Sequence, residues 1–261
     1  MKLPIYQIDA FTDQVFGGNP AGVCPLEAWL TTETMQKIAM ENCVAETAFF
    51  IPTDDGFHIR WFTPEFEMDL CGHATLAAAH VLARHLNYKY PKIKFQSNSG
   101  ELLVTVEGDL LTLDFPARMP VPAEAPQIIL DGISHKPLEI LKARDYVLVY
   151  EDEDVIRRIQ PDVSLLNQIN IDPGGIIVTS KGKDVDFVSR FFTPQASVFE
   201  DPVTGSAHCS LIPFWAERLG KDELSALQLS PRGGKLFCKN AGERVLISGK
   251  AVTYLEGFVT I

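Results

Sequence analysis

Two stretches of this 261-residue chain repeat each other: Arg60-Trp61-Phe62-Thr63-Pro64 and Arg190-Phe191-Phe192-Thr193-Pro194. Four of the five residues are identical, and the second stretch follows the first at an offset of 130 residues. Self-similarity at so long an offset indicates a duplicated structural unit rather than a short solenoid repeat. The chain is therefore expected to contain two copies of one fold.

Downstream of each copy, a turn of small residues opens a helical pattern. The first turn is Cys71-Gly72-His73-Ala74 and the second is Thr204-Gly205-Ser206-Ala207, now at an offset of 133. Apolar residues then recur at helical spacing. They are Ala74, Ala78, Val81, Leu82 and Leu86 in the first copy, and Ala207, Leu211, Phe214, Trp215 and Leu219 in the second. Each pattern predicts a core helix, and Pro213 predicts a kink or a delayed start in the second.

Short alternating segments surround each helical pattern and predict strands separated by Gly, Asn and Asp turns. They include Gly56 to Phe62 and Lys92 to Gln96 in the first copy, and Asp186 to Phe192 and Val252 to Val259 in the second. The expected fold class is α+β, with two pseudo-symmetric domains that each curl a mixed sheet around a central helix. The Pro-rich connector at 116–126 places the domains at 1–117 and 118–261, and the final strand can pair back with the first domain.

Composition narrows the range of functions. The formal net charge is -11, with 23 Lys plus Arg against 34 Asp plus Glu, and no basic patch is evident, so a nucleic-acid partner is not expected. No apolar run has the length of a membrane helix. The five cysteines are odd in number and lack a C-x-x-C pair, which disfavours a disulfide framework and a structural zinc site. A soluble cytoplasmic protein with reduced thiols is expected.

The two turns that open the core helices suggest a binding site. A helix N-terminus presents unpaired N–H groups and a partial positive charge, so it attracts a carboxylate without any lysine. Glycine at positions 72 and 205 lets a ligand approach the backbone closely. Because the turns occupy equivalent places in a duplicated unit, we expect both to face one cleft between the domains.

The copies differ in their ionisable groups. Cys71 corresponds to Thr204, His73 to Ser206, and Glu46 to Ile176. Glu46 begins an otherwise apolar strand, so its carboxyl group either faces solvent at the rim or is partly desolvated. If it faces the cleft, desolvation favours the protonated form and suits a general acid/base.

Several ordered motifs resemble those of the phenazine biosynthesis PhzF-like family over nearly the whole chain. They are Phe16-Gly17-Gly18-Asn19-Pro20, Ala45-Glu46-Thr47, Arg60 to Pro64, Cys71 to Leu76 and Glu200 to Ala207. The resemblance implies a diaminopimelate-epimerase-like fold, a homodimer, and an isomerase that moves a proton without metal or pyridoxal phosphate. It implies a small carboxylate or amino-acid-like substrate, with no other cofactor.

Carried over by motif, the resemblance implies that Glu46 is the proton shuttle. His73 and Ser206 would orient the substrate, Asp201 would hold its amino or ring group, and the helix ends at Gly72 and Gly205 would bind its carboxylate. Asn19, Cys71 and Thr204 complete the substrate-binding set by position in the same motifs.

Other functions remain open. The same cleft could bind a small carboxylate, or a protein partner, without turnover. The related epimerases and proline racemases, which are similar in fold, place a cysteine ahead of each glycine. Racemisation by two thiols is disfavoured here because Thr204 occupies the second of these places and its hydroxyl is too weak an acid. A metal site from Cys71, His73, His208 and Cys209 has poor chelating spacings. A hydrolase pair of Cys71 with His73, or Ser206 with His208, is not expected, because residues two apart at a helix start do not face each other.

Overall fold

The computed structural model describes residues 1–261 and divides into two compact units. Unit 1 consists of Met1–Phe115 and Leu246–Ile261, and unit 2 of Pro116–Val245. The chain thus leaves unit 1 in the Pro-rich connector, two residues before the boundary expected from the sequence, and returns to unit 1 for its last sixteen residues.

Unit 1 is a mixed sheet with two helices. Its strands are paired in the order β18-β1-β2-β3-β4-β6-β7-β8, and β5 adds to the end of β4. The pairs β2/β3 and β4/β6 are parallel and the others antiparallel. The elements are β1 (Lys2–Ala10), β2 (Asn19–Pro25), α1 (Thr32–Asn42), β3 (Glu46–Thr53), β4 (Gly56–Phe62), β5 (Glu67–Met68), α2 (Gly72–Arg84), β6 (Lys92–Ser97), β7 (Gly100–Glu107), β8 (Leu110–Pro116) and β18 (Ala251–Thr260).

Unit 2 repeats that order. Its strands are paired as β9-β10-β11-β12-β13-β15-β16, with β14 at the end of β13 and parallel pairs at β11/β12 and β13/β15. The elements are β9 (Val121–Pro122), α3 (Gln127–Asp131), β10 (Glu139–Lys142), β11 (Tyr146–Val149), α4 (Glu153–Arg158), α5 (Val163–Leu166), β12 (Ile176–Lys181), β13 (Phe187–Phe192), β14 (Glu200–Asp201), α6 (Gly205–Leu219), β15 (Glu223–Gln228), β16 (Gly234–Ala241) and β17 (Arg244–Gly249), which contains the return to unit 1. The shared order confirms an α+β fold built from a duplicated unit.

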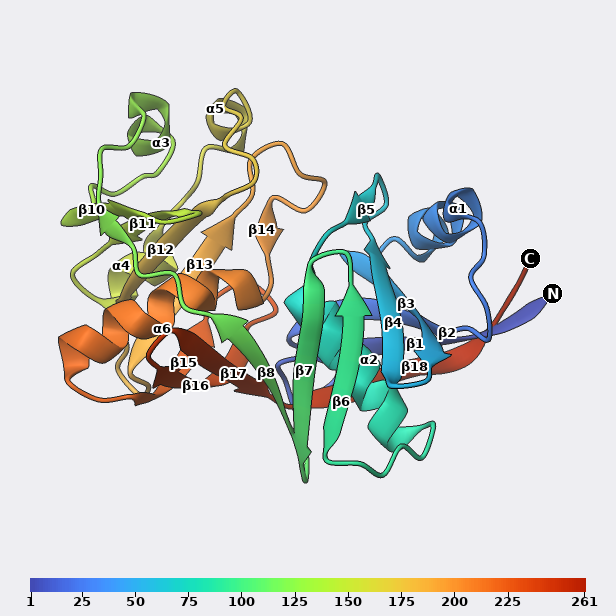
Figure 1. The fold of residues 1–261 in the computed structure, drawn as a ribbon. Coiled ribbons are helices and arrows are strands. Elements are labelled where there is room, and N and C mark those ends of the chain that lie inside the picture. Colours follow the sequence, from blue (N-terminus) through green and yellow to red (C-terminus); the bar gives the residue numbers. More distant parts are fainter. The chain divides into compact units, whose positions relative to one another are not determined.

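Each sheet curls around one long helix, α2 in unit 1 and α6 in unit 2 (Figure 1). Nine of the thirteen residues of α2 are buried, and eleven of the fifteen residues of α6. A helix that is buried on nearly all sides is expected to be mostly apolar, as the buried residues of α2 and α6 are. Each helix therefore lies in the core of its unit, and this packing fixes the position of the first helical turn.

Pro213 does not delay α6, contrary to one of the two outcomes expected from the sequence. The helix begins at Gly205 and continues through Pro213 to Leu219. Because proline has no N–H, it leaves the carbonyl of Cys209, four residues earlier, without its helical donor. The backbone N–H of Arg118 donates to that carbonyl at 2.8 Å, so the connector supplies the missing hydrogen bond.

The final strand, β18, pairs with β1 from Lys2↔Thr260 to Ala10↔Ala251, with one bulge beside Gln7. The N- and C-termini therefore lie together on unit 1 (Figure 1). In unit 2 the corresponding edge position is taken by β9, which pairs with β10. None of the helices combines the length and the hydropathy needed to cross a lipid bilayer.

Candidate functional site

Four of the residues selected from the sequence come together in unit 1. Asn19 and Glu46 are the first residues of β2 and β3, which run parallel with Ala21 opposite Glu46. Cys71 is the N-cap residue of α2, and His73 is the second residue of that helix. Because parallel strands begin at the same sheet edge, both strand starts lie at the end of α2 where its N–H groups are free of helical partners.

The imidazole of His73 is the centre of this cluster. Its Nε2 lies 3.0 Å from Oε2 of Glu46, and its Nδ1 lies 3.2 Å from Nδ2 of Asn19 and 3.5 Å from Sγ of Cys71. The His73 and Glu46 side chains are 6% and 15% exposed, respectively. Although Nε2 and Oε2 are close, the ring N–H does not point at the carboxylate, and neither buried atom has an aligned hydrogen bond in the protein. Such atoms are rare in folded proteins, and a bound water, a ligand or a catalytic role commonly accounts for them.

The electrostatics of the cluster favour a thiol and a basic imidazole. Burial raises the pKa of Cys71 to about 11, and the neighbouring Glu46 carboxylate adds to the increase. Burial lowers the pKa of His73, but the Glu46 carboxylate opposes it, and that pKa lies well above its usual value. Cys71 is therefore not an activated thiolate, and its buried thiol matches the common inert state of free cysteine.

The first turn of α2 has no side-chain cap. Thr31, Asp152 and Asp162 cap α1, α4 and α5 by accepting a backbone N–H, whereas Cys71 makes no such bond to α2. Thr204, the N-cap residue of α6, also makes none. Both central helices thus begin with a glycine and an uncapped turn, which is the arrangement that binds anions at other helix N-termini.

One geometric argument from the sequence was wrong. Cys71 and His73 do face each other, with Sγ and Nδ1 3.5 Å apart. The rule for residues two apart applies inside a helix, but Cys71 precedes α2 in an extended conformation, with φ -140° and ψ 110°. A Cys-His hydrolase is still disfavoured, now because burial holds Cys71 in its thiol form.

Glu46, Cys71 and His73 are also near enough for a shared ion to be considered, because one donor atom from each lies within 4.8 Å of the others. The ring of His73 argues against that arrangement. Glu46 lies 3.0 Å from Nε2, whereas Cys71 lies beside Nδ1 on the other side of the ring. One ion cannot bind both nitrogens of an imidazole, so these three side chains do not form a tetrahedral centre in this geometry.

In unit 2, Asp201 and Thr204 form a second cluster at the start of α6. The Thr204 hydroxyl donates to Oδ2 of Asp201 at 2.5 Å and accepts from Nε2 of Gln228 at 3.1 Å. The Gln228 amide also donates to the Asp201 carbonyl and accepts the Thr204 backbone N–H. Since a hydroxyl has only one proton, the proton of Thr204 is directed at Asp201.

Sequence reasoning missed Gln228. This residue is 1% exposed, and its side chain makes three hydrogen bonds that hold the turn before α6. A signal was present, because Leu224 and Ala226 precede it at alternate, inward positions of β15. A glutamine at an inward strand position must find partners for its amide, so such a residue is a candidate for a built polar site.

The positions of the other predicted residues of unit 2 say less about their roles. Gly205 and Ser206 are the first two residues of α6, and Ser206 is partly exposed. His208 is fully buried and its Nδ1 donates to the Thr204 carbonyl at 2.7 Å, so it makes no pair with Ser206. The expectation that these residues share a cleft with unit 1 stays a prediction.

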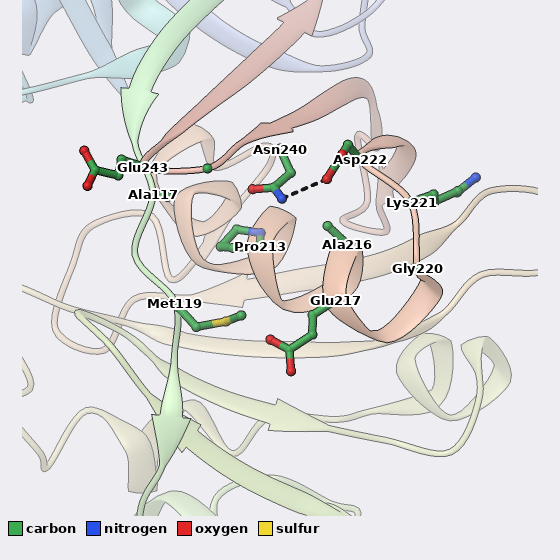
Figure 2. Close-up of a pocket in the computed structure, with 11 residues that line it drawn as sticks. Ala117, Met119, Pro213, Ala216, Glu217, Gly220, Lys221, Asp222, Asn240 and Glu243 are labelled. Atoms are coloured by element: carbon green, nitrogen blue, oxygen red, sulfur yellow. Dashed lines mark hydrogen bonds between the residues drawn. The ribbon is translucent and has the colours of Figure 1, made fainter.

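A pocket of about 610 Å³ lies at the other end of α6 (Figure 2). In its wall, Asn240 donates to Asp222 at 3.0 Å, and Met119 from the connector lies beside the helix. It is lined by Ala117, Met119, Pro213, Ala216, Glu217, Gly220, Lys221, Asp222, Asn240, Gly242 and Glu243. None of the site residues predicted from the sequence belongs to this pocket.

Comparison with known proteins agrees with the duplicated fold. A solved structure of a predicted epimerase from Pseudomonas aeruginosa has a TM-score of 0.75 and covers 99% of each chain, at 19% identity. At that identity the likeness concerns the fold alone, and the α+β fold of this chain is similar to the fold of that protein.

The family itself is shown by closer matches. The model of the phenazine biosynthesis-like protein family matches residues 8–257, and the chain belongs to this family. A crystal structure of a PhzF-family protein from Enterococcus faecalis is 44% identical, with a TM-score of 0.96 and complete coverage of both chains. A relative from Pseudomonas aeruginosa, 50% identical over 98% of each chain, is named an uncharacterised isomerase.

Proposed function

We propose that this protein is an isomerase that moves a proton on a small carboxylate or amino-acid-like substrate, with Glu46 as general acid/base and no cofactor. One observation carries the proposal. Oε2 of Glu46 and Nε2 of His73 are buried 3.0 Å apart, and neither has an aligned hydrogen bond within the protein. Two such groups beside an uncapped helix start are suited to one ligand that accepts a hydrogen bond and exchanges a proton. The isomerase named among the relatives supports the same reaction class.

The proposed step is redox-neutral. Glu46 takes a proton from one carbon of the substrate, and the electrons of that C–H bond enter the adjoining π system. The same carboxyl group then returns the proton to another carbon, which restores a neutral double bond at a new position. The N–H groups at Gly72 stabilise the substrate carboxylate, and Nε2–H of His73 donates to an oxygen that gains charge in the intermediate.

The second unit contributes to the proposal by motif. Asp201, Thr204, Gly205 and Ser206 are assigned to substrate binding, with the turn before α6 held rigid by Gln228. Rigid placement of binding groups lowers the entropic cost of reaching the reactive geometry. The shared cleft, the homodimer, the cytoplasmic location and independence from cofactors stay predictions.

The contacts of Thr204 and Cys71 favour a single base over two-thiol racemisation. The Thr204 hydroxyl proton is engaged by Asp201, and the pKa of Cys71 is raised to about 11 by burial and by Glu46. A racemase of that kind needs a proton acceptor on each side of the carbon. Here one group, Glu46, has the position for both transfers.

The test begins with a screen of small carboxylates and amino acids for thermal stabilisation of the protein. Each binder is then incubated in D₂O, and deuterium incorporation at carbon is followed by NMR. Glu46→Gln should reduce the exchange rate by about 10²-fold to 10⁴-fold, the usual contribution of a general acid/base. The exposed Glu41→Gln on α1 is the matched control and should exchange at the normal rate.

Full exchange in Glu46→Gln would refute the assigned role. Stabilisation by a binder that never exchanges deuterium would favour the alternative function, a non-catalytic receptor for the same class of ligand. An unchanged unfolding midpoint in urea shows that the variant is folded.

A further inference from the structure

The two ring nitrogens of His73 have chemically different neighbours. Nδ1 faces the amide nitrogen of Asn19 at 3.2 Å and the thiol of Cys71 at 3.5 Å. Nε2 faces the Glu46 carboxylate at 3.0 Å. Because an imidazole changes its role with the position of its proton, these neighbours decide what His73 can do.

Both neighbours of Nδ1 are donors. An asparagine NH₂ group has two protons and no lone pair for hydrogen bonding, and a thiol that remains protonated donates its single proton. Burial together with Glu46 keeps Cys71 in that form. Both donors need the lone pair of Nδ1. A proton on Nδ1 would occupy that lone pair and would face the N–H of Asn19 and the S–H of Cys71.

We propose that Asn19 is a positioning residue that keeps the proton of His73 on Nε2 rather than Nδ1. His73 is then a hydrogen-bond donor toward the substrate at every pH, whether the ring is neutral or charged, and Glu46 is the only base. The consequence for catalysis rests on the proposed function, but the position of the proton does not. Asn19 thereby changes from a substrate-binding residue, as expected from its motif, to a residue that acts through His73.

Asn19 is better suited than Cys71 to this task. It is the nearer donor, it is fully buried, and a thiol is a weaker donor than an amide. Its backbone is also fixed: Asn19 pairs with Ala10, and Gly18 before it has φ +61°. A Cβ at Gly18 would lie 2.1 Å from the Ala10 carbonyl oxygen, so only glycine permits this approach of the loop to β1.

The experiment locates the ring proton by NMR. The full-length protein is labelled with ¹⁵N-histidine, and two-bond ¹⁵N–¹H spectra distinguish the two neutral tautomers and the imidazolium ion. Spectra are recorded from about pH 6 upward until the ring of His73 loses a proton, and His73→Gln identifies the signals of His73 among those of the six histidines. In the wild-type protein, the proton lost as the pH rises should come from Nδ1, with Nε2 still protonated.

Asn19→Asp reverses the contact, because a carboxylate only accepts. The proton should then remain on Nδ1 in the neutral ring, and the pKa of His73 should rise by about one to three units, as expected for a new charge at this distance. Asn42→Asp is the matched control, since Asn42 ends α1 and its amide donates to the hydroxyl of Thr47 on β3 rather than to the ring. Cys71→Ala should leave the proton on Nε2.

Two results would overturn the inference. They are a wild-type neutral ring protonated on Nδ1, or an Asn19→Asp variant with the wild-type tautomer. If Asn19→Asp does not fold, the wild-type spectra alone decide. The deuterium-exchange test is independent: a protein with the expected tautomer but no exchange retains this inference and loses the proposed function.

Discussion

The first turns of α2 and α6 have the same backbone and different chemistry. Each begins with a glycine after an uncapped, extended residue, at the same place in a repeated sheet. At α2 the side chains form a group of acids and a base, and two buried atoms lack aligned partners. At α6, Asp201, Thr204 and Gln228 direct their hydrogen bonds at one another. The two copies therefore share a frame and differ in the side chains that the frame positions.

This difference shows which surroundings allow a carboxyl group at the start of the strand. Glu46 and Ile176 begin the equivalent strands β3 and β12. Each of these strands pairs with a parallel neighbour, β2 in unit 1 and β11 in unit 2. Glu46 has a histidine within 3.0 Å, whereas Ile176 is fully buried in a cluster of aliphatic and aromatic side chains. A carboxyl group is tolerated in unit 1 because its neighbours are polar, and the sequence position alone does not provide that environment.

The largest expected effect follows from moving the acid to the other copy. Ile176→Glu buries a carboxyl group among Tyr146, Val178 and Phe192 without a basic partner, and it should destabilise the protein by more than about 4 kcal/mol. Urea unfolding measures the loss. A cost under about 1 kcal/mol would show that the two strand starts are interchangeable, contrary to the comparison.

The next largest effect is expected for the two arginines of the repeated motif, Arg60 and Arg190. Arg190 binds both oxygens of Glu200 and also donates to the carbonyls of Ile156 and Ile159. Arg60 binds both oxygens of Glu67 in the same manner. Its third hydrogen bond goes to the hydroxyl of Thr32 instead of to buried carbonyls.

We therefore expect Arg190→Met to cost about 3 kcal/mol, because it leaves a carboxylate and two carbonyls poorly solvated. Arg60→Met, whose partners can be hydrated, should cost about 1 kcal/mol. Urea unfolding of both variants measures the difference. Equal costs would mean that the additional carbonyl contacts of Arg190 contribute nothing.

Replacement of Gln228 examines the closed network of unit 2. Gln228→Met keeps the length of the side chain and removes its amide, leaving the Thr204 N–H and the Asp201 carbonyl without this partner. The expected loss is about 2 kcal/mol, within the usual range for buried groups left unsatisfied. If the midpoint in urea is unchanged, the turn before α6 does not depend on this amide.

The smallest effect concerns the pH dependence of stability. Thr75 and His208 occupy equivalent places, and each donates to the carbonyl of its N-cap residue, Cys71 or Thr204. Burial lowers the pKa of His208 from 6.5 to about 4, and burial together with His85 lowers that of His80 to about 4. Between these values the unfolded chain binds protons that the folded protein does not, so stability declines as the pH falls from about 6.5 toward 4.

His208→Thr, the residue that the first copy uses, retains the hydrogen bond and removes one of these two groups. Roughly half of the decline attributed to them should disappear when urea midpoints at pH 7 and pH 5 are compared with those of the wild type. An unchanged decline would show that His208 is not neutral in the folded protein.

Much of the fold could be predicted from the repeat. The central helices and the strand Gly56–Phe62 were correctly predicted from periodicity, which reports burial directly. Strand β2 was missed because Asn19, Pro20 and Gly22 are typical of turns. It forms because it pairs with β1 on one side and with β3 on the other. The glycine lets the strands pack closely, since a Cβ at Gly22 would lie 2.8 Å from Oγ1 of Thr47. The helices α3 and α4 were also missed, since five or six residues are too few to show a period.

The site was predicted in part. The motif order selected Asn19, Glu46, Cys71 and His73, and the fold of unit 1 does bring their side chains together. The partners of each ring nitrogen could not be predicted, because they depend on the extended conformation of Cys71 and on the fixed loop before Asn19. Gln228 was missed because its partners are 24 and 27 residues away in the chain.

The return of β18 to β1 has a consequence for synthesis on the ribosome. All of unit 2 lies within one uninterrupted segment, whereas unit 1 must wait for the last strand of the chain to complete its edge. The part that is translated first is thus finished last, the reverse of the usual N-terminal-first order. A nascent chain stopped near residue 245 would expose the edge of β1, which is a hydrogen-bonding template for aggregation until the final sixteen residues emerge.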